Sequence, residues 1–101
     1  MATHHIILWK LKEDLSASQK SEIKKNIKIG LEGLYGKIPG LLSIKVNTEC
    51  LPSGNVDLML DSVFDSPESL KGYSVHPEHL AVANGMVRPY TAERHCMDFE
   101  D

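Results

Sequence analysis

The period at which apolar residues recur changes along the chain, and few folds are compatible with the order of these changes. In residues 5–11 and 41–51 the side chains alternate between two faces with period 2, which is typical of β-strands. In residues 16–35 and 77–87, apolar residues recur every three or four positions, which is typical of helices. The predicted strands cover residues 5–11, 41–51, 56–64 and 91–99.

The predicted helices begin at recognisable start signals. Ser16 and Gln19 form a capping box, in which each side chain satisfies a backbone N–H of the first turn. Pro67 and Pro77 each follow a residue that can cap a helix, and proline suits the first helical position because it lacks only an N–H that would be unpaired there. The predicted helices cover residues 16–35, 66–72 and 77–87.

This order of elements predicts an α+β domain of the ferredoxin-like type, built on the split βαβ unit. Right-handed crossovers place the strands in the order 4-1-3-2 across one four-stranded antiparallel sheet, with the helices on one face. The helices leave a second face uncovered, either the face of His5, Ile7, Trp9 and Leu11 or its counterpart. A second copy of the same sheet would cover it, so we expect a homodimer.

Length and charge exclude several classes of protein. A chain of 101 residues supports a single domain, residues 1–101. The formal net charge is −3, and lysine and arginine are spread along the chain without a basic stripe, so we expect no nucleic-acid partner. No apolar run approaches the ~20 residues of a membrane span, so we expect no membrane partner and a cytoplasmic location.

The two cysteines are expected to be reduced. Cys50 and Cys96 match no C-x-x-C pattern and are too few for the disulfide framework of a small secreted domain. The predicted strand order also puts them on opposite edges of the sheet, where a disulfide within one chain cannot form.

The stretch from Tyr73 to His79 carries the acid–base candidates. Pro77 fixes a helix start, so we expect His76 to cap the helix and His79 to lie in its first turn, where the helix dipole disfavours a charged imidazolium. A neutral imidazole accepts a proton near neutral pH, and the Tyr73 phenol can donate a hydrogen bond to an oxygen that gains negative charge. A purely structural interpretation is also open, in which both rings pack at a helix end.

The same stretch does not predict a metal centre. His76 and His79 are three residues apart, a spacing that allows a shared metal on a helix, and Glu78 is adjacent. The proline and the cap turn His76 outward, however, and no third ligand has a diagnostic spacing. Glycine-rich phosphate loops are also absent from the sequence. We therefore predict neither a metal site nor a cofactor.

The stretch resembles the Y-x-x-H-P-x-H element of the stress-responsive A/B barrel family, called Dabb. The resemblance extends to a first strand that contains a histidine, to the segment from Val63 to Leu70 that leads into Tyr73, and to Asp98 and Phe99 near the end. It implies a stress-responsive protein of the dimeric α+β barrel type, in which each protomer keeps a small-molecule pocket between sheet and helices.

The resemblance also implies roles for individual residues. Plant polyketide cyclases of this fold use a tyrosine and the last histidine of the element, which match Tyr73 and His79. By this likeness, His79 removes a proton from a carbon between two carbonyls and Tyr73 stabilises the enolate, in a small carbonyl or aromatic compound. The candidate ligand-binding residues are His5, Ile7, Trp9 and His76.

Two further interpretations stay open beside the enzymatic one. Plant cyclases tend to have aromatic residues on the first helix where this chain has Ile23 and Lys24, and a lysine on that wall suits an anionic or smaller ligand. The protein is alternatively a non-enzymatic stress-responsive dimer whose pocket binds a ligand or is vestigial. A third alternative is an oxygenase-like or haem-handling protein on the same dimeric barrel, which needs an iron ligand in the cavity.

Overall fold

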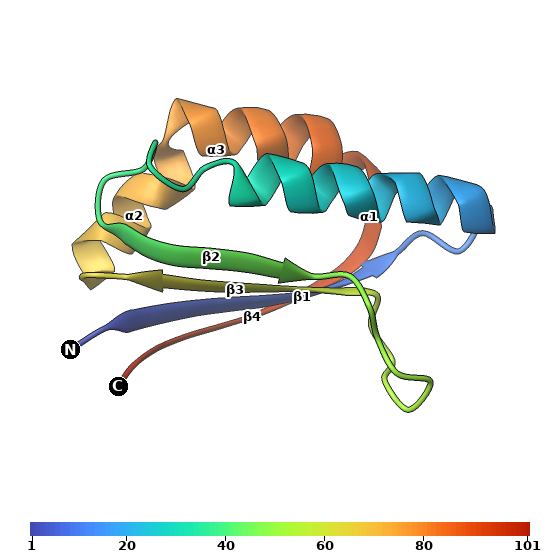
Figure 1. Cartoon of the computed structure of the whole chain (residues 1–101), viewed down its shortest axis with the longest axis horizontal. Helices are drawn as coiled ribbons and strands as arrows, with labels where there is room; N and C mark the ends of the chain where they lie inside the picture. The colour runs from blue at the N-terminus through green and yellow to red at the C-terminus, as the bar shows by residue number, and fades with distance from the viewer.

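The computed structural model describes all 101 residues and places four strands in one antiparallel sheet. The order across the sheet is β2-β3-β1-β4, which confirms the predicted strand order and the α+β, ferredoxin-like fold (Figure 1). Each neighbouring pair is antiparallel, and β1 lies between β3 and β4. The strands are β1 (Thr3–Leu11), β2 (Leu41–Asn47), β3 (Leu58–Phe64) and β4 (Thr91–Glu100).

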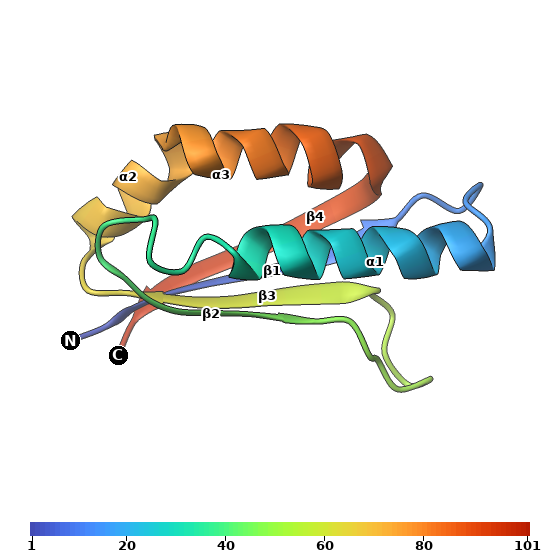
Figure 2. The same ribbon diagram turned by 45° about the horizontal axis from the view of Figure 1, so that its top comes forward.

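The helices all lie on one side of this sheet (Figures 1 and 2). The predicted capping box opens α1: the Ser16 hydroxyl accepts the Gln19 N–H at 3.2 Å, and the Gln19 side chain accepts the Ser16 N–H at 2.8 Å. No helix in the structure combines the length and the apolar composition that a membrane span requires. The helices are α1 (Ala17–Glu32), α2 (Pro67–Val75) and α3 (Pro77–Val82), the last continued by a π turn (Ala83–Val87) and a 3-10 turn (Arg88–Tyr90).

The second strand is shorter than predicted, ending at Asn47 rather than at residue 51. The chain rejoins the sheet at Asp57, whose N–H donates to the Trp9 carbonyl at 2.9 Å and whose carboxylate accepts the Leu11 N–H at 2.8 Å. The residues between have no strand partner, so Cys50 lies in the connecting loop and not on an edge strand. Both cysteines are free, as expected, and both are exposed.

The second helix runs past Gly72, where we predicted its end, and continues to Val75. A glycine inside a helix costs about 1 kcal/mol relative to alanine. This cost is offset by Tyr73, whose ring is only 2 % exposed and lies 5.1 Å from the ring of Phe64. Burial of the next side chain therefore extends the helix, and Tyr73 becomes a helical residue. The other helices also end differently: α1 stops at Glu32, and the 77–87 segment changes to a π turn after Val82.

The hydrophobic core lies between the sheet and α1. Along β1, alternate residues from Thr3 to Leu11 are buried, including His5, Ile7 and Trp9, and they face the helices. Ile27 and Leu31 of α1 pack in the same cluster. The face of His5, Ile7, Trp9 and Leu11 is thus the covered one, so its counterpart is the face that lacks a layer.

We call this uncovered side of the sheet the open face. Cross-strand partners project to the same side, so the register places Met97 of β4 beside Ile6, and Phe99 beside His4. Met97 is 65 % exposed and Phe99 is 40 % exposed, and the Phe99 ring stacks on His4 with a centroid distance of 4.7 Å. The apolar part of the open face consists of Ile6, Leu8, Met59, Val63, Met97 and Phe99.

Candidate functional site

One capping residue joins α2 to α3 and brings the side-chain rings of Tyr73 and His79 close together. His76 is the C-cap of α2 and the N-cap of α3, and its extended backbone turns the chain between them. Its Nδ1 accepts the N–H of Glu78 at 3.1 Å, and Pro77 follows as the first helical residue, as predicted. This turn brings the rings of Tyr73 and His79 to a centroid distance of 4.1 Å.

Both rings line a cavity of about 150 Å³ between the sheet and the helices. The structure brings five of the six candidate residues together there: Tyr73 and His79 from the helices, and His5, Ile7 and Trp9 from β1. The sixth, His76, lies outside the cavity and borders a surface hollow near α2. The remaining lining residues are Leu31, Leu60, Ser74, Ala83, Val87, Arg88, Thr91 and Arg94.

Burial keeps both acid–base candidates in their neutral forms. It raises the pKa of Tyr73 above its usual range, with Arg94 opposing only in part, so the phenol stays protonated. Burial likewise lowers the pKa of His79 below its ordinary value of 6.5, and the positive charge of Arg88 lowers it further. The backbone carbonyl of Ser74, which favours the charged imidazolium, raises the pKa only in part. The Nδ1 atom of His79 is buried without a hydrogen-bond partner. The site thus offers a neutral imidazole beside a phenol that can donate.

Two arginines give the cavity its positive charge. Arg88 from the 3-10 turn and Arg94 from β4 both line it. Lys24, where the sequence suggested a cationic wall, instead lies on the outer side of α1 among other lysines. The suggestion of a cation on this wall came from the family resemblance, whereas the helical spacing of Ile23, Ile27 and Leu31 already puts Lys24 on the other side of α1.

A second polar cluster borders the cavity at β1 and β4. His5 Nδ1 lies 2.5 Å from Asp98 Oδ1, and Cys96 Sγ lies 3.8 Å from the same nitrogen. Burial and the neighbouring Asp98 raise the pKa of the Cys96 thiol, so the cysteine is a poor nucleophile as it stands. This cluster is not evident from the sequence alone, because His5 is far from β4 in the chain, although the period of β4 puts Arg94, Cys96 and Asp98 on one face.

The pKa of His79 predicts a pH dependence of stability. Because its folded-state pKa is lower than its unfolded value, the unfolded chain binds more protons as the pH falls through about 6.5. The contribution of His79 is therefore fully present above that value and is lost as the pH falls toward the folded pKa. We expect His79→Gln to flatten the dependence of unfolding free energy on pH, measured by urea unfolding between about pH 5 and about pH 8. Equal slopes for the parent and for His79→Gln would contradict the assignment of a buried neutral imidazole.

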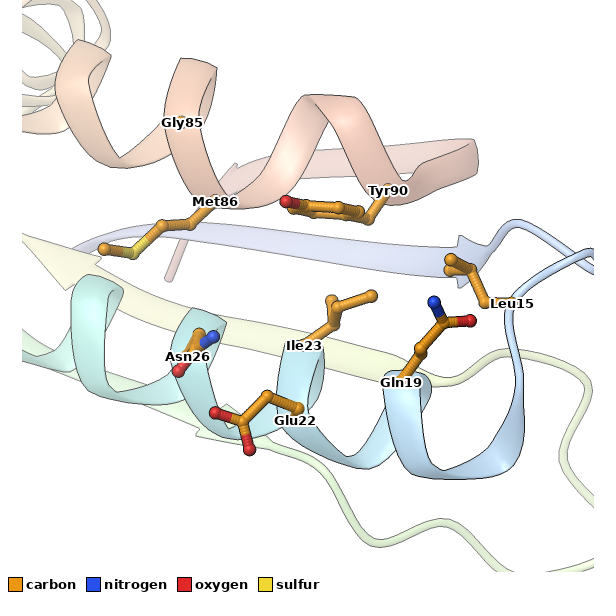
Figure 3. A pocket seen from close by; sticks show the side chains of 8 residues that line it. All are labelled: Leu15, Gln19, Glu22, Ile23, Asn26, Gly85, Met86 and Tyr90. Carbon is orange, nitrogen blue, oxygen red and sulfur yellow. The ribbon is translucent and has the colours of Figure 1, made fainter.

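A larger surface hollow, of about 280 Å³, lies between α1 and the helical segment after α3. In Figure 3, Met86 and Tyr90 face Ile23 across it, and polar side chains of α1 form one rim. It is lined by no histidine, cysteine or basic side chain. The smaller cavity at Tyr73 and His79 is the better candidate, because convergent acid–base groups define a site more than volume does.

Comparison with known proteins agrees with this fold. The family model described as Stress responsive A/B Barrel Domain matches residues 3–101. A dimeric protein of unknown function with a ferredoxin-like fold from Bacteroides fragilis is 30 % identical, with 99 % of this chain and 96 % of that chain covered and a TM-score of 0.92. No curated protein sequence matches the chain significantly.

Two more distant structures share the fold alone. A Dabb family protein from Mesorhizobium loti is 16 % identical, with a TM-score of 0.77 and coverage of 99 % of this chain and 96 % of that chain. The hydroxynitrile lyase from Passiflora edulis is 18 % identical, with a TM-score of 0.72 and coverage of 97 % and 91 %, respectively. With nearly the whole chain matched by the family model, this protein belongs to the stress-responsive A/B barrel domain (Dabb) family.

Proposed function

We propose that the protein is a homodimer whose cavity binds a short β-keto acid and transfers a proton to and from it through His79. One observation carries the proposal: the Nδ1 atom of His79 is buried without a partner, in a cavity where the ring lies 4.1 Å from that of Tyr73. A buried polar atom without a partner is costly, and a ligand that supplies the partner recovers that cost.

The chemistry needs only these side chains. Neutral His79 accepts a proton from the carbon between the two carbonyls, and the electron pair moves onto a carbonyl oxygen. The Tyr73 hydroxyl donates a hydrogen bond to that oxygen as it gains negative charge. The enolate carbon then takes a proton back from the imidazolium, which restores neutral His79. The reaction needs no cofactor.

The size and charge of the cavity favour a short, anionic ligand. At about 150 Å³ it matches cavities that hold one benzene ring, and it is smaller than the roughly 300 Å³ at which drug-sized pockets begin. A long polyketide chain and a haem macrocycle both exceed this volume. Arg88 and Arg94 supply positive charge for a carboxylate. These features favour a β-keto acid of a few carbons over the polyketide and haem alternatives.

The homodimer is supported by the open face. Its apolar residues cover the centre of the sheet, and no helix packs on that side (Figure 2). A second copy of the same face would bury Ile6, Leu8 and Met97 against their equivalents, which removes apolar surface from water. The similar protein from Bacteroides fragilis is described as dimeric, which agrees with this proposal.

The test is hydrogen–deuterium exchange at carbon 2 of acetoacetate, followed by proton NMR in D₂O above the spontaneous background. We expect the parent to accelerate exchange and His79→Gln to lower the rate by about 10²-fold or more. Tyr73→Phe should lower it by about 10²-fold, as loss of an oxyanion donor does. Arg94→Met should weaken binding and so raise the acetoacetate concentration needed for half-maximal rate.

Tyr35→Phe is the control, because Tyr35 is 62 % exposed and does not line the cavity. Its exchange rate should equal that of the parent. Exchange that persists in a folded His79→Gln variant would reject the role of this base. If acetoacetate raises the melting temperature of the parent without any exchange, the cavity binds a ligand but does not catalyse, which is the non-enzymatic alternative.

A further inference from the structure

We propose that His5, Cys96 and Asp98 form a binding site for a divalent transition metal ion, with zinc as the best fit. No sequence motif indicates such a site, because His5 is more than ninety residues from the other two ligands. The strand register creates it: β1 pairs with β4 so that His5 lies opposite Asp98 and Ile7 opposite Cys96. One ligand atom from each of the three side chains then falls within 4.8 Å of the other two.

The spacing of these atoms is close to that of a tetrahedral zinc site. Zinc bonds of about 2.0–2.3 Å at tetrahedral angles put neighbouring ligand atoms roughly 3.4–3.6 Å apart. Cys96 Sγ lies 3.5 Å from Asp98 Oδ1 and 3.8 Å from His5 Nδ1. The remaining pair, His5 Nδ1 and Asp98 Oδ1, is closer at 2.5 Å, because the two share a hydrogen bond when no metal is bound.

The ion would replace that hydrogen bond. Its entry requires the two atoms to separate by roughly 1 Å, if they are to reach the spacing of metal ligands. The His5 side chain is held by the sheet and is 9 % exposed, whereas the Asp98 side chain is 47 % exposed and is therefore free to move. The site needs a rotation of one exposed carboxylate and no change of the backbone.

The ligand types narrow the choice of ion. A thiolate, an imidazole and a carboxylate are a mixed soft and hard set that suits zinc and excludes calcium and magnesium, which require oxygen ligands. Ionised Cys96 and Asp98 together carry two negative charges, which a divalent cation neutralises. Three protein ligands leave a fourth position for water or a small molecule, as in catalytic zinc sites rather than structural ones.

The test is a titration of the full-length protein with Co²⁺, which reports its ligands spectroscopically. Thiolate ligation gives a near-ultraviolet charge-transfer band, and tetrahedral coordination gives intense visible bands. We expect both kinds of band to appear, and we expect Zn²⁺ to abolish them by displacing the bound Co²⁺. Cys96→Ser should abolish the charge-transfer band, and Asp98→Asn should weaken cobalt binding by about tenfold or more. Both residues are exposed, so these variants are expected to fold.

The chain provides two matched controls. Cys50 is the other free, exposed cysteine, so Cys50→Ser should leave the spectrum unchanged. His4 and Asp101 form a second histidine–carboxylate pair, 2.8 Å apart, that lies outside the cluster of potential metal ligands, so Asp101→Asn should also have no effect. The absence of a charge-transfer band, or its loss in Cys50→Ser, would overturn the proposal. Because the readout is optical, the result is independent of whether the cavity catalyses proton exchange.

Discussion

Replacing Gly40 with alanine is expected to destabilise the protein by about 2–5 kcal/mol, the sum of a left-handed backbone penalty and an overpacking cost. Gly40 has a φ of +81°, which side chains other than glycine rarely adopt. An added Cβ would also lie 2.5 Å from the Cβ of Ser69 and 2.7 Å from a carboxylate oxygen of Asp65. The chain enters β2 here, and the Gly40 carbonyl accepts the Asp65 N–H at 2.9 Å.

A substitution at Gly36 measures the backbone penalty separately from the overpacking cost. Its φ is +87°, but a Cβ added there meets nothing within 4 Å. Gly36→Ala should therefore carry only the backbone penalty, about 1–2 kcal/mol. Urea unfolding of both variants measures the difference, provided that the slope of free energy against urea stays constant. Equal costs at the two positions would mean that the contact with Ser69 and Asp65 relaxes freely.

Replacing Met97 with glutamate is expected to convert the proposed dimer into a monomer. Met97 lies on the open face, and the dimer axis doubles the effect because each substitution appears twice in one interface. Burying a charge without a partner costs several kcal/mol per site, so the dimer dissociation constant should rise by at least about 10³-fold. Sedimentation velocity over a series of protein concentrations measures this constant.

Ile29 provides the control, because it is 62 % exposed, close to the 65 % of Met97, but belongs to α1 on the other side of the sheet. Ile29→Glu should leave the dimer intact and change stability little. Dissociation caused by Ile29→Glu but not by Met97→Glu would place the interface on the helices and reject the open face as the dimer surface.

The fold was predictable because several independent signals agreed. The period of β1, the capping box at Ser16 and the prolines at 67 and 77 each gave an element of the right type. The strand order then followed from the handedness of the crossovers. Element ends were less predictable: Gly72 indicates a helix end locally, but burial of the neighbouring Tyr73 outweighs it. Local propensity is weak when a large ring can be buried.

The candidate site was predictable only in part. Tyr73 and His79 are close in sequence, and their helix start is visible from Pro77, so their proximity follows from local geometry. Arg94 and Asp98 reach the same region only through the register of β4 against β1. The register of two strands is set by which residues of each face the core. Because β4 is exposed along nearly its whole length, its hydrophobic pattern does not indicate the register of its pairing with β1.

The alternation of β1 separates two kinds of evolutionary change. Odd-numbered positions from Thr3 to Leu11 face the helices and include the cavity wall, whereas Ile6 and Leu8 face the other way. If the cavity binds a ligand and the open face forms a dimer, as proposed, substitutions at odd positions change the ligand and substitutions at even positions change the assembly. The two properties can then evolve independently along one strand, as long as no insertion or deletion shifts the numbering and exchanges the two roles.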